Sequence, residues 1–360
     1  MNKHYYVAIM AGGIGSRFWP KSRTSMPKQF LDILNTGKSL IQWTYERFAA
    51  FIPEENIFVV TSEDYEDIVA QQLPQLNKQN IVTEPSRKNT APCIAYISYK
   101  LLQKDPKAAL IVAPSDHVIL DVETFKNTCL KALNFVTQIK AFVTLGITPS
   151  YPNTGYGYIQ HDTFSVAEGI YKVKTFTEKP NLELAKTFLA SGDFLWNAGI
   201  FVWQVNNIIK AFEKFQPEMF DLFENEKALF NSTKEKEAIN RIYPLCTNIS
   251  IDFAIMEKAD NVYVMPSSFG WSDLGTWNSA YENLEKDYLA NAVVGNNVII
   301  IDATKCMISA TDNKLVLLQG LDDCIVVDTQ DVLMICKKDK EQEIKEYVAE
   351  VKRIKGDIYL

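Results

Sequence analysis

Short apolar runs rich in valine and isoleucine alternate with longer amphipathic stretches over the first half of the chain. The runs cover residues 5–10, 57–61, 110–113 and 141–147. The stretches between them cover residues 39–51, 64–73, 91–104 and 123–139. This alternation predicts parallel strands joined by crossover helices. We therefore expect an α/β fold with a Rossmann-like sheet, mixed but mostly parallel and flanked by helices.

The pattern changes in the second half of the chain. Strand-like runs at 158–160 and 170–177 predict antiparallel additions to the sheet edge, and a charge-rich helical stretch follows at 205–241. From residue 289 the chain consists of short β-rich runs closed by a charged amphipathic helix at 339–354. We therefore predict a large domain at 1–288 and a small β-rich domain with a terminal helix at 289–360.

Charge and composition exclude several classes of partner. The 37 Lys and Arg residues are outnumbered by 44 Asp and Glu residues, so the net charge is -7 and there is no basic footprint for nucleic acid. No apolar run is long enough to span a bilayer, and the amino terminus lacks a signal-peptide pattern. Six scattered cysteines without a C-x-x-C pair are typical of a reducing compartment. We therefore expect a cytoplasmic protein without a membrane partner.

A glycine-rich loop follows the first predicted strand, where an open parallel sheet binds its ligand. The loop has the pattern Gly-Gly-x-Gly-x-Arg, which ends at Arg17, and Lys28 follows eleven residues later. Glycines let backbone N–H groups approach a phosphate, and the two cations supply countercharge. Phe18 stands where a dinucleotide-binding fingerprint needs glycine, and the Gly-Lys-Ser/Thr of a Walker A loop is missing, so both motifs are excluded.

Further motifs follow this loop in order along the chain, at residues 84–92, 114–117, 176–180, 196–201, 250–252 and 270–277. With the loop, they resemble the mannose-1-phosphate guanylyltransferases, a branch of the sugar-phosphate nucleotidyltransferases. The resemblance implies an enzyme that transfers GMP from GTP to α-D-mannose 1-phosphate and gives GDP-mannose and pyrophosphate. The sugar phosphate would attack the α-phosphorus in line, and Arg17 and Lys28 would be the catalytic cations.

The resemblance also implies the remaining site residues. The expected metal is Mg²⁺, held by Asp116 and Asp273. The nucleotide would be bound by Ala11, Gly12, Gly13, Gly15, Ser16, Glu84, Pro85, Asn89, Thr90 and Ser115. The sugar phosphate would be bound by Tyr156, Gly157, Glu178, Lys179 and Asn197. We expect the loss of Arg17 or Lys28 to lower turnover by roughly 100-fold or more and to leave folding almost unchanged. Asparagine at either metal position should leave the empty protein as stable as before or slightly more stable.

Structural alternatives stand beside these assignments. Asp116 can cap a turn, and Asn89 and Thr90 can cap the helix that follows them. Glu178 and Lys179 can form a surface ion pair, because adjacent side chains at a strand end need not diverge.

Rival functions remain open at this stage. They are the same chemistry with another substrate pair, such as glucose 1-phosphate and UTP, or a non-catalytic nucleotide-sugar sensor. Some members of the family carry a second, isomerase domain, for which this sequence has no room, so we expect a single activity. The oligomeric state is open, with a homodimer through the C-terminal domain as the candidate.

Overall fold

The computed structural model describes residues 1–360, which form two compact units. The first unit contains Met1–Gly12, Tyr45–Pro114 and Ile119–Trp271. The second contains Gly13–Thr44, Ser115–Val118 and Ser272–Leu360. Because the units exchange segments, neither corresponds to one half of the sequence. The predicted domain boundary at residue 289 lies inside the second unit and stays a prediction.

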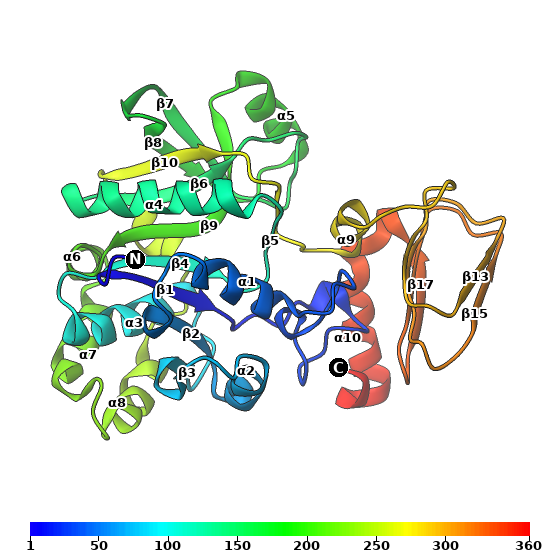
Figure 1. Ribbon diagram of the computed structural model, residues 1–360, viewed down its shortest axis with the longest axis horizontal. Coiled ribbons are helices and arrows are strands. Elements are labelled where there is room, and N and C mark those ends of the chain that lie inside the picture. Colours follow the sequence, from blue (N-terminus) through cyan, green and yellow to red (C-terminus); the bar gives the residue numbers. More distant parts are fainter. The chain divides into compact units, whose positions relative to one another are not determined.

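The first unit is built on a nine-stranded sheet with the strand order β3-β2-β1-β4-β9-β6-β10-β8-β7 (Figure 1). The strands are β1 (Tyr5–Met10), β2 (Ile57–Ser62), β3 (Ile81–Glu84), β4 (Ala109–Pro114), β6 (Phe142–Ile147), β7 (Tyr158–Ala167), β8 (Ile170–Thr177), β9 (Phe194–Gln204) and β10 (Val262–Ser267). Only β8 and β9 run against the direction of the others. The mostly parallel mixed sheet is therefore confirmed. The insertion of antiparallel β9 between β4 and β6 was not predicted.

Helices cover both faces of this sheet. They are α2 (Glu66–Gln72), α3 (Thr90–Lys104), α4 (Val122–Gln138), α5 (Leu182–Ser191), α6 (Val205–Phe215), α7 (Pro217–Glu226) and α8 (Glu235–Ile242). Figure 1 shows α4 lying along β6 and β9, which it contacts together with β4 and β10. On the other face α3 packs against α6 and α7. The core there includes Tyr6 and Ala8 of β1, whose side chains alternate in direction with those of Val7 and Ile9, as strand geometry requires.

The second unit contains the glycine-rich loop segment and the C-terminal residues. Its strands β12 (Ala292–Val294), β14 (Met307–Ser309) and β16 (Cys324–Asp328) pair in parallel, and β17 (Leu333–Lys337) adds an antiparallel edge. A second parallel pair joins β13 (Val298–Ile301) and β15 (Val316–Gln319). Successive parallel turns of this kind form a short β-helix. The β-rich domain that the sequence predicted is therefore a β-helix. Figure 1 shows the terminal helix α10 (Ile344–Lys355), in red, beside β17.

Short elements mark the places where the chain changes unit. They are α1 (Leu40–Ala49), β5 (Val118–Ile119) and β11 (Trp271–Ser272), and α9 (Trp277–Asn283) follows β11 in the second unit. None of the helices is both long enough and apolar enough to cross a bilayer. All six cysteines are free thiols.

Candidate functional site

The glycine-rich loop leaves β1 and enters two short 3-10 turns, η1 (Ser16–Phe18) and η2 (Lys28–Phe30). Gly15 precedes η1 with a φ of 67°, and a Cβ at this position would lie 2.5 Å from the Cβ of Lys28. Glycine adopts this left-handed conformation freely and leaves room for the neighbouring chain. The close approach at Gly15 thus brings the two parts of the loop motif together.

A cavity of about 310 Å³ in the second unit lies beside this loop. We call it the signature-loop cavity, and it is lined by Gly15, Ser16, Arg17, Lys28, Asp116, His117, Asp273, Gly275 and Lys345. The four charged residues predicted to act in catalysis or metal binding all line it. They come from three separate segments of the sequence, so the tertiary structure brings them together.

Lys28 is the most constrained of these side chains. Its ammonium lies 2.7 Å from Oδ2 of Asp116, and it donates hydrogen bonds to the backbone carbonyls of Asp273 at 3.0 Å and Leu274 at 2.9 Å. The residue is only 4% exposed. An ammonium has three donors, and these three acceptors match them. Lys28 therefore also holds the cavity together, a role that the sequence-based expectation left out.

Arg17 lines the same cavity with a hydrogen-bonding atom that the protein leaves unsatisfied. Its Nε is buried and has no hydrogen-bond partner. Nearby, burial raises the pKa of the Glu341 carboxyl, and the positive charge of Arg17 partly opposes that shift. Buried donors are rarely left without a partner, so the unpartnered Nε of Arg17 suits a site that takes an anionic ligand.

Asp116 and Asp273 are the carboxylates of this cavity that could hold a divalent cation. Burial would raise the pKa of Asp116, but the charges of Lys28 and His117 outweigh it and hold the pKa below its ordinary value. Asp273 accepts a hydrogen bond from the backbone N–H of Gly275 at 3.0 Å, as a turn-capping residue does. Because Asp116 is paired with Lys28, its loss should cost stability. This reverses the expectation of an equally stable or more stable empty protein.

Among the predicted nucleotide residues, Glu84 has a strongly shifted pKa. It ends β3 in the first unit, it is 8% exposed, and it accepts a hydrogen bond from the hydroxyl of Tyr243. Burial raises its pKa to about 7, although hydrogen bonds from Tyr243 and Cys93 oppose the shift. A Cβ on Gly12 would lie 3.5 Å from Oε2 of Glu84, so the glycine-rich loop begins beside this carboxyl.

The raised pKa of Glu84 predicts a specific pH dependence of stability. The folded protein keeps the proton that the unfolded chain releases above the ordinary pKa of 4.5, so stability is lost as pH rises from about 4.5 to about 7. Glu84→Gln removes this loss, which is on the order of 3 kcal/mol. Urea unfolding at pH 5 and pH 7.5 should therefore show the variant gaining stability relative to wild type at the higher pH. Glu183→Gln is the control, because Glu183 is exposed. A stability difference between the Glu84 variant and wild type that does not change with pH would contradict the assignment.

Other predicted nucleotide residues have structural partners. Asn89 caps α3 by accepting the N–H of Thr90 at 2.9 Å, and the hydroxyl of Thr90 accepts the N–H of Ile251 at 2.8 Å. The backbone of Ala11 is held by Val60 and Thr61. In the second unit the carbonyl of Ser115 accepts the Thr44 hydroxyl at 3.1 Å, and that of Gly13 accepts the Gln29 amide at 2.9 Å. Pro85 follows Glu84 directly and is half-buried.

The predicted sugar residues gather in the first unit around Asn197 of β9. The N–H of Asn197 donates to the carbonyl of Gly157 at 2.8 Å, and its side-chain amide donates to Oδ1 of Asp252 at 2.8 Å. A Cβ on Gly157 would lie 2.7 Å from Oε2 of Glu178 and 3.5 Å from the Cβ of Asn197. Gly157 therefore leaves the space in which Glu178 and Asn197 approach each other.

Lys179 and Tyr156 complete this group. Strand β8 ends at Thr177, and Lys179 has a φ of 43°, so its ammonium turns back to lie 2.6 Å from Oε1 of Glu178. The two side chains thus form the exposed ion pair that was the structural alternative. The ring of Tyr156 packs edge-on against Trp196 and Trp271, with centroids 5.1 and 5.2 Å away.

Sequence reasoning gave no role to several residues of these clusters. Asp252 begins a π-helical turn (Asp252–Met256), and burial raises its pKa to about 6. Such turns are frequent at functional sites, and the Ser-Ile-Asp motif was the available signal. Tyr243, Glu341 and Lys345 had no sequence signal, because none lies in a motif and only the fold defines their neighbours.

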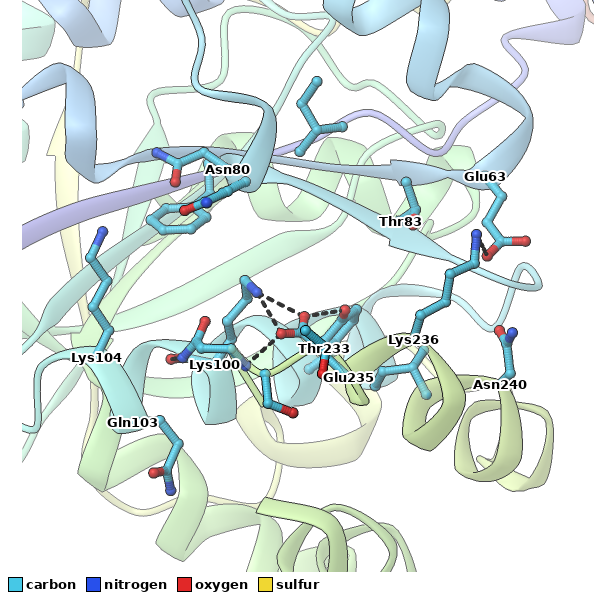
Figure 2. A pocket seen from close by; sticks show the side chains of 17 residues that line it. Glu63, Asn80, Thr83, Lys100, Gln103, Lys104, Thr233, Glu235, Lys236 and Asn240 are labelled. Atoms are coloured by element: carbon cyan, nitrogen blue, oxygen red, sulfur yellow. Dashed lines mark hydrogen bonds and ion pairs between the residues drawn. The ribbon is translucent and has the colours of Figure 1, made fainter. Parts of the chain in front are cut away.

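A larger cavity, of about 670 Å³, lies elsewhere in the first unit, against edge strand β3 (Figure 2). Figure 2 shows that four of its charged side chains form two ion pairs, whereas Lys104 lies apart from both pairs. Lys100 contacts Glu235 at 2.7 Å, and Lys236 contacts Glu63 at 3.2 Å. Only Lys104 remains outside these pairs, so the smaller signature-loop cavity, with three cations, is the stronger candidate site for phosphates.

The fold is that of a nucleotidyltransferase, and the signature-loop cavity is its candidate phosphate site. The family model described as nucleotidyl transferase matches residues 6–289, and a model described as a MannoseP isomerase/GMP-like beta-helix domain matches residues 296–351. The second match agrees with the parallel turns of β12 to β16.

Similar proteins narrow this class. Alginate biosynthesis protein AlgA from Pseudomonas syringae pv. tomato is 38% identical over 349 residues, which cover 95% of this chain and 70% of that protein. A mannose-1-phosphate guanylyltransferase from Salmonella montevideo is 37% identical over 354 residues, covering 96% and 73%. A crystal structure described as mannose-1-phosphate geranyltransferase, from Thermus thermophilus, has a TM-score of 0.87 at 28% identity and covers 97% of this chain and 99% of that one. The chain belongs to the mannose-1-phosphate guanylyltransferase family, as its motifs predicted.

Proposed function

We propose that this nucleotidyltransferase transfers GMP from GTP to mannose 1-phosphate, giving GDP-mannose and pyrophosphate, and that the signature-loop cavity binds the reacting phosphates. The observation that carries the assignment of the cavity is the convergence of Arg17, Lys28, Asp116 and Asp273 on one volume of about 310 Å³. A turn with solvated cations would not collect these side chains from three segments.

Mg²⁺ fits the two carboxylates of the cavity. No group of three or more His, Cys, Asp or Glu side chains that could hold a metal occurs in the chain. Magnesium ions usually take only one or two carboxylates and complete their shell with water and phosphate oxygens, so Asp116 and Asp273 are sufficient. When bound, the ion supplies positive charge to the phosphates. The open Nε of Arg17 supports a phosphate at the same cavity.

The chemistry needs no general base from the protein. The second pKa of a phosphate monoester is about 6, so mannose 1-phosphate is largely a dianion at neutral pH and can attack the α-phosphorus itself. Arg17 positions the triphosphate, and the charges of Arg17 and Lys28 neutralise the charge that grows on the leaving pyrophosphate. Since the bond between the sugar and its phosphate is not broken, the anomeric configuration is retained and added pyrophosphate reverses the reaction.

We assign the cluster around Asn197 to the sugar phosphate. Asn197 and Glu178 provide a donor and acceptors for hydroxyl groups, and the exposed Lys179 provides a cation for the phosphate. Gly157 leaves the space between them, and Tyr156 contributes an aromatic wall.

The nucleotide is assigned to the glycine-rich loop and to the segment after β3. Loop glycines 12, 13 and 15 offer backbone N–H groups to phosphates, while Glu84 and Pro85 face the base or ribose. Asn89 and Thr90 act on the nucleotide through the terminus of α3, which Asn89 caps and Thr90 begins.

The test is a matrix of pyrophosphate-release assays. Each of the four nucleoside triphosphates is combined with mannose, glucose or N-acetylglucosamine 1-phosphate, with and without Mg²⁺. Release with GTP and mannose 1-phosphate, dependent on Mg²⁺, supports the proposal. Preference for UTP and glucose 1-phosphate would favour the rival substrate pair, and binding without release would favour a sensor.

A variant of Lys179 tests the sugar assignment. Lys179→Ala should raise the KM for mannose 1-phosphate by roughly tenfold or more, because a charged hydrogen bond contributes about 1.5–3 kcal/mol, and should leave the KM for GTP unchanged. Lys174→Ala is the matched control, since Lys174 lies on β8 in an exposed ion pair with Asp162. Equal losses for both substrates would move Lys179 to another role.

We also propose that the chain forms a homodimer. A homodimer through the C-terminal strands is supported by leucine and isoleucine side chains that stay exposed there, among them Ile299 and Leu317, which are partners across β13 and β15. Light scattering on the purified protein would test it. The cytoplasmic location stays a prediction.

A further inference from the structure

The terminal helix α10 contributes a third cation to the signature-loop cavity. Lys345, its second residue, is exposed and lines the cavity together with Arg17 and Lys28. More than 300 residues separate Lys345 from the loop in sequence, so no motif connects them. The contact arises within one compact unit.

The core of the second unit determines where Lys345 lies. Ile344 is fully buried, and Tyr347, Val348 and Val351 pack on the same side, with the spacing of one helix face. This face packs into a core shared with Phe18, and α10 contacts η1, the turn that carries Arg17.

Two further contacts fasten the loop segment to the C-terminal residues. The indole N–H of Trp19 donates to the carbonyl of Tyr359 at 2.8 Å. The guanidinium of Arg23 contacts both carboxylate oxygens of Asp331, at 2.7 and 2.5 Å. The helix that carries Lys345 is therefore packed beside the loop segment, and hydrogen bonds fasten that segment to residues before and after the helix.

The charge of the cavity indicates what this cation does. Positive charge comes from Arg17, Lys28 and Lys345, and negative charge from Asp116 and Asp273. Without Lys345, two positive side chains would face two negative ones. Lys28 already has three acceptors in the protein. A triphosphate whose pyrophosphate portion gains charge as it leaves needs further cations.

We infer that Lys345 binds, together with Arg17, the phosphates of GTP that leave as pyrophosphate, so that the C-terminal helix is part of the catalytic centre. This inference rests on the proposed function. It gives the β-helix a mechanistic task, which is to hold α10 against the glycine-rich loop.

The experiment measures pyrophosphate binding to the full chain by calorimetry in the presence of Mg²⁺, without any turnover. Lys345→Ala should weaken pyrophosphate binding by roughly 10-fold to 100-fold, the range for a lost charge-assisted hydrogen bond. It should raise the KM for GTP in the same direction and leave the KM for mannose 1-phosphate unchanged. Lys345→Arg should restore most of the affinity, because arginine also pairs with phosphate.

Lys352→Ala is the matched control, since Lys352 lies on the same helix in an exposed ion pair with Asp357 at 2.8 Å. The inference is overturned if Lys345→Ala binds pyrophosphate like wild type, or if it loses both substrates equally together with thermal stability. Failure of the proposed function has a different signature, because wild type and the Lys352 variant would then also release no pyrophosphate from GTP and mannose 1-phosphate.

Discussion

Lys28→Ala is expected to lower turnover by about 100-fold or more and also to lower the free energy of unfolding, whereas Arg17→Ala should lower turnover by a similar factor with little change in stability. The factor is typical of losing one preorganised group that stabilises a transition state. The difference in stability comes from the partners of Lys28. Its loss leaves Asp116 without its cation and two backbone carbonyls without a donor, which should cost about 1–3 kcal/mol.

Steady-state kinetics and urea unfolding measure the two effects separately. Lys21→Ala serves as the control, because Lys21 belongs to the same segment and donates to the backbone of Asp32. Near-normal turnover in the Arg17 or Lys28 variant would mean that the loop is only a turn. Unchanged stability of the Lys28 variant would mean that its three contacts contribute nothing to the cavity.

Asp116→Asn and Asp273→Asn should each remove most activity and raise the Mg²⁺ concentration for half-maximal rate by roughly tenfold or more. Mutation of a residue that only orients a metal ligand lowers metal affinity by about 10–100-fold, so mutation of a direct ligand should lower it at least as much. The two variants should differ in stability. In Asp273→Asn the new side chain can still accept the N–H of Gly275, whereas Asp116→Asn removes the charge that pairs with Lys28.

The pH dependence separates the two carboxylates further. Because the pKa of Asp116 lies below its ordinary 3.8 in the folded protein, its stabilisation is present above that pH and is lost as pH falls through the folded pKa. The stability gap between wild type and Asp116→Asn should therefore close in acid. If both variants kept wild-type turnover with the same Mg²⁺ dependence, the shared metal site would be wrong.

The sequence by itself determined the family and many of the elements, although β9, β10 and α5 were not predicted. The apolar run predicted at residues 5–10 has the same limits as β1, and the strand predicted at 170–177 has the same limits as β8. Local patterns carry this information, because side-chain alternation and helical periodicity depend on neighbours a few residues apart. The same holds for the glycine-rich loop, where a glycine with a positive φ, Gly15, stands two residues before Arg17. The family then followed from the order of such motifs.

Only the tertiary structure decided how the motifs meet. It inserted β9 between β4 and β6 and paired it with β7 as well, which set Asn197 beside Gly157, and it brought Asp252 to the Asn197 side chain. It also buried Lys28 against Asp116 and brought Lys345 to the loop. These contacts join residues tens to hundreds of positions apart. Burial and hydrogen bonding select them from many chemically equal partners, and a single sequence does not state which carboxylate a lysine will meet.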